Sequence, residues 1–125
     1  LPGEKVDEVL THVNHVVNDQ RIHASLKGRG YNASEVSDVN SNGYNVIAKS
    51  VREIFPAAIA APYLVVGTTD ARHYSKVSKN IFRFIPLLLS NEDLKRIHGI
   101  NERIAAENYK DVIRFYVKVM GNCSQ

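Results

Sequence analysis

Two short segments carry the side chains whose types and spacing could do chemistry: residues 67–72 (Gly-Thr-Thr-Asp-Ala-Arg) and residues 96–102 (Arg-Ile-His-Gly-Ile-Asn-Glu). Together they supply one guanidinium (Arg72), one imidazole (His98) and a hydroxyl-rich turn beside apolar stretches. Such a set suits a metal-dependent site that recognises a carboxylate. Because a catalytic zinc takes about three protein ligands, one histidine cannot hold it. The sequence therefore predicts that this chain is part of an enzyme rather than a whole one.

The other histidines are weaker candidates for metal binding. His12 and His15 lie three residues apart on an expected helix, but its apolar stripe leaves both on the solvated side. His98 differs because it precedes a glycine, which tolerates unusual backbone angles, and lies near Asn101 and Glu102. The sequence has no nucleophile elbow, no phosphate-binding loop and no dinucleotide fingerprint. Residues 32–34 and 122–124 match the acceptor pattern for N-glycosylation, which is common by chance.

Composition excludes several classes of function. The 125 residues are 44% hydrophobic and 23% charged, as in a globular protein. The net charge of +3 comes from 16 basic and 13 acidic residues that are scattered, so we expect no nucleic-acid partner. No apolar run reaches about 18 residues, so we expect no membrane span. The single cysteine excludes an internal disulfide, and no signal peptide is visible.

Helical periodicity is clear in three segments that must position these side chains. Residues 6–17 repeat apolar side chains at helical spacing, and so do residues 44–55 and 109–120. Ser41 is the expected N-cap of the second helix, and Pro56 follows its end. Ser90 with an aspartate three residues later predicts a capping box and a short helical turn.

Three further segments predict strands. Residues 22–26 alternate apolar and polar side chains, and residues 81–85 are mostly apolar. Residues 63–66 are wholly apolar, as expected of a strand that is covered on both faces of a sheet. A helix followed by a half-buried strand is two-thirds of a β-α-β unit, and polar residues 31–42 are expected to link two modules. Residues 67–70 follow a strand directly, at the carboxyl edge where α/β sheets bind ligands.

These segments resemble a known family. Residues 67–72, then Ile81-Phe82-Arg83-Phe84, then residues 96–102 resemble the dizinc metallopeptidases and amidohydrolases that include aminoacylase, carboxypeptidase S and succinyl-diaminopimelate desuccinylase. The resemblance is strongest to the branch of carboxypeptidase S and the N-fatty-acyl-amino-acid synthase/hydrolase. It runs from end to end of the chain, which looks like the C-terminal part of such an enzyme.

The resemblance implies an α/β fold. Residues 1–29 would be the closing part of a ferredoxin-like lid or dimerisation domain, a helix plus a strand. Residues 30–125 would be the C-terminal part of a catalytic domain, a mixed sheet flanked by helices. The full-length protein would be a zinc-dependent peptidase of the carboxypeptidase or dipeptidase type. It would hydrolyse the amide bond of a peptide or N-acyl amino acid that has a free carboxylate.

The resemblance also implies roles for individual residues. His98 matches a zinc ligand, one of those that hold two zinc ions per active site. Substrate would contact Arg72, Thr68, Thr69 and Asn101, with supporting roles for Gly67, Asp70, Gly99 and Glu102. The general base and the other zinc ligands are expected upstream, so no catalytic residue is expected in this chain, and the 125 residues alone would be inactive.

Two alternatives remain open. The enzyme could be an N-acyl-amino-acid deacylase of the same family, or the chain could be a non-catalytic dimerisation or binding module. The expected partners are the substrate, the missing N-terminal part of the same protein and, through the lid, a second copy. The sequence leaves the compartment unknown, although the resemblance slightly favours a secreted, periplasmic or vacuolar protein.

Overall fold

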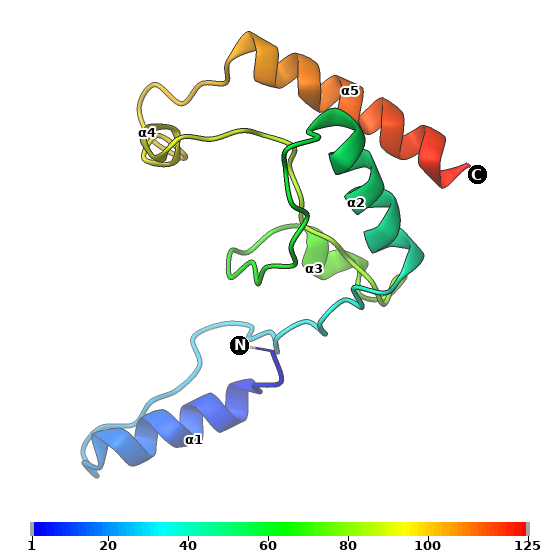
Figure 1. The fold of residues 1–125 in the computed structure, drawn as a ribbon. Helices are drawn as coiled ribbons and strands as arrows, with labels where there is room; N and C mark the ends of the chain where they lie inside the picture. The colour runs from blue at the N-terminus through cyan, green and yellow to red at the C-terminus, as the bar shows by residue number, and fades with distance from the viewer. Residues whose placement is uncertain (1, 125) are drawn as a thin grey trace. The chain divides into compact units, whose positions relative to one another are not determined.

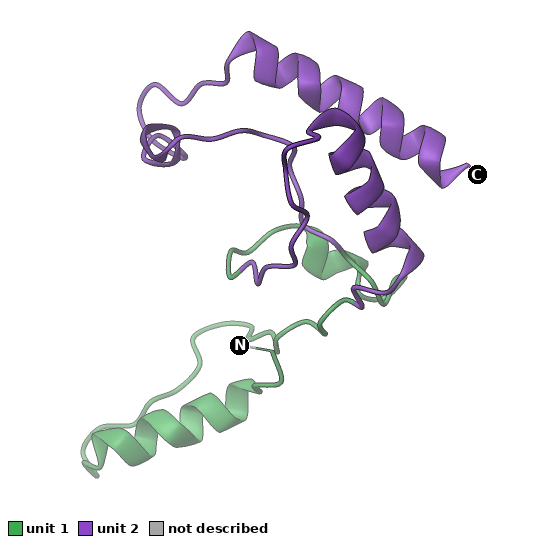
Figure 2. Cartoon of the chain, viewed as in Figure 1, with its two compact units in different colours: residues 1–37, 66–81 green, residues 38–65, 82–125 purple. Residues whose placement is uncertain are grey.

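The computed structural model describes residues 2–124, and Leu1 and Gln125 lie outside the described residues. The described chain forms five helices: α1 (Val6–Val17), α2 (Asn42–Ile54), α3 (Ala71–Tyr74), α4 (Asn91–Leu94) and α5 (Ala106–Cys123) (Figure 1). The chain divides into two compact units, one of residues 1–37 and 66–81 and the other of residues 38–65 and 82–125 (Figure 2). The first unit holds α1 and α3, and the second holds α2, α4 and α5.

The predicted α/β fold class is wrong for the part of the chain that the structure describes. Residues 2–124 contain helices and irregular segments but no strand, so neither the mixed sheet nor the strand of a ferredoxin-like lid is present. The expected strands at 22–26, 63–66 and 81–85 are all irregular. Alternation of side chains says which face of a strand would be buried. A strand also needs a neighbour to receive its backbone hydrogen bonds.

In the segment 22–26 a side chain replaces that neighbour. The backbone N–H of Ala24 donates to Oδ1 of Asn14 at 2.9 Å, and Nδ2 of Asn14 donates to the carbonyl oxygen of Ala24 at 3.5 Å. Asn14 lies on α1, so one amide group satisfies both polar backbone groups of Ala24. The segment is thereby attached to the helix that precedes it without forming a ladder.

The segment 63–66 was expected to be covered on both faces, and this prediction is wrong. Tyr63 is 89% exposed and Val66 is 84% exposed. A wholly apolar run predicts burial only where other elements lie against it. Among residues 2–124 no element covers these two side chains.

The helix α1 confirms the predicted periodicity, but its apolar stripe is not covered. None of its residues is buried, and Val16 is 66% exposed. The helix ends at Asn18, which adopts left-handed angles (φ 44°, ψ 39°) and donates its N–H to the carbonyl oxygen of Asn14 at 3.1 Å. Asparagine tolerates these angles better than most residues, so it suits a helix end.

The helix α2 begins and ends close to the predicted residues. The hydroxyl of Ser41 accepts a hydrogen bond from the N–H of Tyr44 at 3.4 Å, so Ser41 is the N-cap as expected. At the other end Phe55 donates to the carbonyl oxygen of Val51 at 2.7 Å, and Pro56 follows. A proline cannot donate a backbone hydrogen bond, so the helix stops before it.

The hydrophobic core lies where α2 packs against α5 in the second unit (Figure 1). Its buried apolar side chains are Val46, Ala48 and Val51 of α2 and Phe115 of α5, which is 2% exposed. The ring of Phe115 also lies 5.2 Å from the ring of Phe84, centroid to centroid. This core is small for a chain of this length, since most large apolar side chains are at least partly exposed.

A polar contact joins the same two helices. The hydroxyl of Ser50 on α2 is fully buried and donates to the carbonyl oxygen of Val46 at 2.8 Å. It also accepts a hydrogen bond from Nδ2 of Asn122 on α5 at 3.0 Å. Because this buried hydroxyl makes both hydrogen bonds, its burial costs little folding free energy. The bond to Asn122 also fixes how the end of α5 lies on α2.

Candidate functional site

The loop that carries His98 has an unusual backbone. His98 has φ 60° and Asn101 has φ 63°, both in the left-handed region that non-glycine residues rarely adopt. The N–H of His98 donates to Oε2 of Glu102 at 3.3 Å, which closes the turn. The imidazole is exposed, and neither ring nitrogen makes a hydrogen bond within residues 2–124. The loop therefore presents an imidazole whose two nitrogens are available.

Gly99 supports this loop in a different way from the one expected. The positive φ angles fall on its neighbours His98 and Asn101, whereas Gly99 itself does not have one. Its N–H donates to the carbonyl oxygen of Arg96 at 2.9 Å, and a Cβ at this position would lie 3.3 Å from that oxygen. The glycine is thus favoured by lack of space, because the backbone passes close to Arg96.

The short helix α4 holds the start of the His98 loop. The predicted capping box is confirmed: the N–H of Asp93 donates to Oγ of Ser90 at 3.2 Å, and the N–H of Ser90 donates to Oδ2 of Asp93 at 2.9 Å. The other carboxylate oxygen of Asp93 forms an ion pair with Arg96. Nε of Arg96 is buried and has no hydrogen-bond acceptor among the described residues. Asp93 therefore connects the beginning of α4 to the turn that leads into His98.

These contacts predict a pH effect. Hydrogen bonds from the hydroxyl and then the N–H of Ser90, together with Arg96, hold the pKa of Asp93 below its ordinary value near 4. The lowered pKa means that the carboxylate stabilises the fold above pH about 4, and that this contribution disappears as the pH falls through the pKa of the folded state. We expect an NMR titration of labelled aspartate side chains to show one resonance, absent in Asp93→Asn, that titrates at a lower pH than an aspartate in an unstructured peptide under the same conditions. A midpoint equal to or above that of the peptide would contradict these contacts.

The predicted substrate turn, residues 67–72, is shaped by hydrogen bonds of Thr69. The N–H of Ala71 donates to Oγ1 of Thr69 at 3.3 Å, and the N–H of Arg72 donates to its carbonyl oxygen at 3.4 Å. This turn leads into α3, and Asp70 accepts from the N–H of His73 at 2.9 Å through its backbone oxygen. Gly67 and Thr68 precede it and are exposed. The turn thus orients the backbone from which the Arg72 side chain extends.

The guanidinium of Arg72 lies over the ring of Tyr31, 5.4 Å from its centroid. Its Nε donates to Nε2 of His73 at 3.2 Å. A cation over an aromatic face is held in place without being neutralised. Within residues 2–124 no acidic group pairs with Arg72, so its two terminal nitrogens remain available for a carboxylate.

The candidate residues fall into two groups. Gly67, Thr68, Thr69, Asp70 and Arg72 belong to the first unit. His98, Gly99, Asn101 and Glu102 belong to the second. Each group is ordered by its own contacts. The roles of these residues toward metal and substrate stay predictions.

Metal binding by this chain alone has no support in the described residues. Residues 2–124 contain no group of three or more His, Cys, Asp or Glu side chains that could hold an ion. His12 and His15 are exposed on α1, as expected from the apolar stripe. The structure therefore gathers no further ligands around His98 within residues 2–124. Nor does any helix in the described part combine the length and apolar character needed to cross a membrane.

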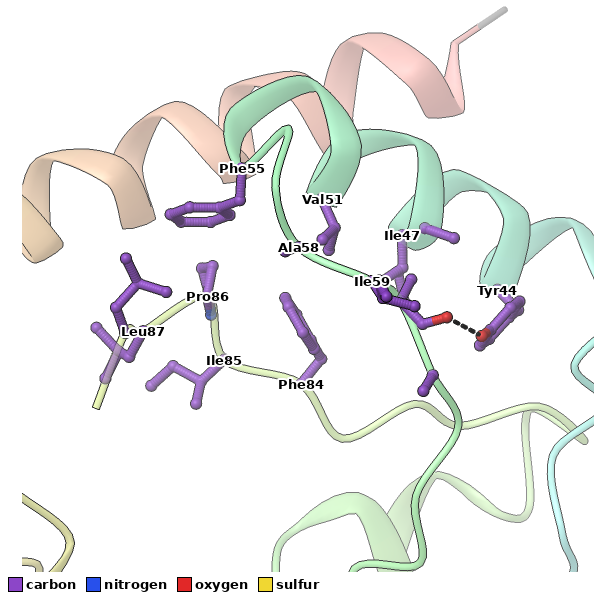
Figure 3. A pocket seen from close by; sticks show the side chains of 14 residues that line it. Tyr44, Ile47, Val51, Phe55, Ala58, Ile59, Phe84, Ile85, Pro86 and Leu87 are labelled. Carbon is purple, nitrogen blue, oxygen red and sulfur yellow. Dashed lines mark hydrogen bonds between the residues drawn. The ribbon is translucent and has the colours of Figure 1, made fainter. Parts of the chain in front are cut away.

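Sequence reasoning missed an apolar hollow of about 240 Å³ in the second unit. Figure 3 shows Tyr44, Val51 and Phe55 on one side and Phe84 and Pro86 on the other. At one end of the hollow, the hydroxyl of Tyr44 donates a hydrogen bond to the carbonyl oxygen of residue 60 at 3.5 Å. The lining contains no acidic or basic side chain. The hollow is therefore unsuited to a metal ion or a carboxylate.

The sequence reasoning also missed two neighbours of the candidate residues. The ion pair of Asp93 and Arg96 had a signal, since acidic and basic residues three apart on a helical turn lie on the same face. Tyr31 under Arg72 had none, because residues so far apart in the chain share no local pattern.

Comparisons with known proteins give relatives over almost the whole chain. The probable carboxypeptidase S-like 2 of Dictyostelium discoideum is 37% identical over 122 residues, 98% of this chain and 24% of that protein. The N-fatty-acyl-amino acid synthase/hydrolase PM20D1 is 34% identical in Xenopus tropicalis, over 97% of this chain and 24% of that protein. The human protein of that name is 33% identical with the same coverage. No family model and no solved structure gave a significant match.

These relatives confirm the resemblance on which the site residues were chosen. The chain spans about a quarter of the length of the curated relatives it matches, so it corresponds to part of a larger protein. Carboxypeptidase S-like proteins and N-fatty-acyl-amino acid synthase/hydrolases both match it from end to end. The chain therefore belongs to the family that the carboxypeptidase S-like proteins and the N-fatty-acyl-amino acid synthase/hydrolases form.

Proposed function

We propose that the protein containing this stretch is a zinc-dependent hydrolase of amide bonds. Its substrate is a peptide or an N-acyl amino acid with a free carboxylate, and its active site holds two zinc ions. This chain supplies one zinc ligand, His98, and the carboxylate-binding Arg72. The observation that carries the proposal is the loop at His98. It holds a free imidazole on a left-handed backbone and is closed by Glu102.

The backbone at His98 supports a functional role. A non-glycine residue with positive φ costs about 1 kcal/mol or more and persists where the surroundings enforce it. Here Glu102 accepts the N–H of His98, and Gly99 lets the chain pass close to Arg96. Such strained positions cluster at active sites. Of the two such residues in this loop, Asn101 has a side chain that tolerates these angles, so His98 is the position that favours a site over an ordinary connection.

The residues present fit zinc as a partial donor set. A neutral imidazole with both nitrogens free can donate one lone pair to zinc and use its other N–H for an outer acceptor. The remaining ligands and the general base then come from the rest of the larger protein. When bound, zinc polarises the scissile carbonyl and lowers the pKa of a bound water toward neutrality. On this proposal the isolated 125 residues hydrolyse nothing.

The side chain of Arg72 sets the orientation of the substrate. Its planar guanidinium offers two parallel N–H groups to a carboxylate, a geometry that lysine cannot reproduce. The stack on Tyr31 and the bond to His73 limit the directions in which those groups point. Thr68, Thr69 and Asn101 add hydrogen bonds to the substrate, and Asp70 helps to shape the turn. Fixing one end of the substrate positions the amide bond for attack.

The names of the relatives favour a second candidate activity for this protein. Several of them are N-fatty-acyl-amino acid synthase/hydrolases, and others are carboxypeptidase S-like proteins. The two substrate classes share a free carboxylate next to the scissile amide. They differ in the group on the other side, an acyl chain or a peptide. The N-acyl-amino-acid hydrolase is therefore the alternative activity for the same residues.

Removal of metal tests the proposal. We expect the full-length protein to lose hydrolysis of N-acyl amino acids and of peptides after dialysis against a chelator, and to regain it on addition of zinc. The carboxamide analogue of each substrate serves as the control for carboxylate recognition, and we expect it to react at least about tenfold more slowly because a charge-assisted hydrogen bond is lost. Unchanged hydrolysis by metal-free protein would refute the proposal. Comparison of the acyl and peptide substrates decides between the two activities.

A further inference from the structure

Two Asn-X-Ser tripeptides occur in this chain, and their surroundings are opposite. Residues 32–34 lie in an irregular segment in which every residue from 25 to 36 is exposed. Residues 122–124 lie at the end of α5, which packs against α2. The sequence pattern is the same in both. The structure distinguishes them by the contacts of the asparagine Nδ2, which is the atom to which an N-linked glycan is attached.

The side chain of Asn32 leaves its nitrogen available. Its Oδ1 accepts a hydrogen bond from the N–H of Val6 at 3.1 Å, which attaches the oxygen end to the first turn of α1. Nδ2 makes no hydrogen bond within residues 2–124. The side chain is exposed, as are its neighbours on both sides. A sugar attached to Nδ2 would displace no contact and would project into solvent.

The side chain of Asn122 has its nitrogen engaged. Nδ2 donates to Oγ of Ser50 at 3.0 Å and lies 3.5 Å from Oε2 of Glu53, both on α2. Ser50 is fully buried. A sugar on this nitrogen would need the space that α2 occupies and would remove a bond between the two helices. A chain modified at Asn122 could not pack α5 on α2 as observed.

We propose that Asn32 is an acceptor for an N-linked glycan and that Asn122 is not. The donor is an oligosaccharide joined to a lipid pyrophosphate. Nδ2 of Asn32 forms a bond with the anomeric carbon of the first sugar, and the bond from that carbon to the pyrophosphate oxygen breaks. The lipid pyrophosphate leaves with the electron pair, and Nδ2 loses one proton to a base of the transferase. The product keeps Oδ1 of Asn32 as the acceptor for Val6.

Site-specific mass spectrometry tests the proposal. The full-length protein is sent through the secretory pathway of a eukaryotic host behind a cleavable leader, so that its own compartment does not affect the result. An endoglycosidase then trims each glycan to one N-acetylglucosamine before digestion with trypsin. Residues 30–49 form one tryptic peptide that contains Asn32 and no second acceptor tripeptide. We expect at least half of this peptide to carry the sugar and the peptide containing Asn122 to carry none.

Two matched variants complete the experiment. Ser34→Ala removes the first acceptor pattern and is expected to abolish the sugar on residues 30–49. Ser124→Ala removes the second pattern and is expected to leave the sugar on Asn32 unchanged. Unmodified Asn32 in the secreted protein would overturn the proposal. A sugar on Asn122 in secreted protein whose α5 keeps its protection from hydrogen exchange would also overturn it.

Discussion

Replacing His98 with alanine in the full-length protein is expected to lower kcat/KM for hydrolysis by about 10³-fold or more. A zinc ion contributes several kcal/mol of transition-state stabilisation, and each 1.4 kcal/mol is about a factor of ten. The ring of His98 makes no hydrogen bond among the described residues. Removal of the ring therefore breaks no hydrogen bond within the described residues, and the interaction that is lost is the proposed bond to zinc. Steady-state kinetics on an N-acyl amino acid give the measurement.

Two further variants separate loss of the ligand from damage to the loop. His98→Asn keeps a residue that tolerates the positive φ observed at this position, so the backbone is preserved while the imidazole is lost. We expect it to be as inactive as the alanine variant. His15→Ala removes an exposed imidazole from α1 and is expected to leave the rate unchanged. A His98→Asn enzyme within about twofold of the native rate would exclude a ligand role.

Replacing Phe115 with alanine is expected to destabilise the packing of α2 on α5 by about 3–5 kcal/mol. The ring is 2% exposed and lies against the rings of Phe84 and Tyr116, at centroid distances of 5.2 and 5.5 Å. With so few buried apolar side chains, the core offers little to refill the cavity. Hydrogen exchange of the α2 and α5 peptides in the full-length protein should accelerate at least about 10²-fold.

The control for this experiment lies on the same helix. Met120 is 66% exposed, and Met120→Ala exchanges one good helix former for another. We expect its effect on exchange to correspond to less than about 0.5 kcal/mol. If Phe115→Ala left the exchange of both helices at the native rate, the core between α2 and α5 would be wrongly described.

The helices were predictable from the sequence because their signals are local. Apolar spacing located α1, α2 and α5, and Ser41 and Ser90 marked helix starts by side-chain capping. Gly121 is instructive, because a glycine directly after the apolar repeat of residues 109–120 favours a helix end, and yet it lies inside α5. A glycine ends a helix only where the chain takes left-handed angles, and the sequence does not encode that locally.

The strands were not predictable because their evidence is not local. Residues 22–26 alternate as a strand should, yet Asn14 provides the hydrogen-bond partners of Ala24. Residues 63–66 are apolar enough for a covered strand, yet Tyr63 and Val66 are exposed. Periodicity describes the faces of a segment and says nothing about a neighbouring strand. The α/β fold class was wrong because the alternation of side chains was taken as evidence that a neighbouring strand exists.

The candidate site was partly predictable. The loop at residues 98–102 was chosen for the family resemblance and for the glycine that follows His98, and the structure does show an unusual backbone there. The positive φ angles belong to His98 and Asn101, however, and Gly99 contributes space beside Arg96. Sequence identifies the residue types that tolerate a tight loop. Which of them takes the strained angles depends on contacts such as that of Glu102 with His98.

The most direct test of zinc binding by His98 is the metal content of the purified full-length protein. Elemental analysis of the native protein is expected to give two zinc ions per chain, and the His98→Asn variant is expected to give close to one. The His15→Ala variant should match the native protein. Two tightly held zinc ions in the His98→Asn variant would contradict the assignment of this imidazole as a ligand, and so would native protein without zinc.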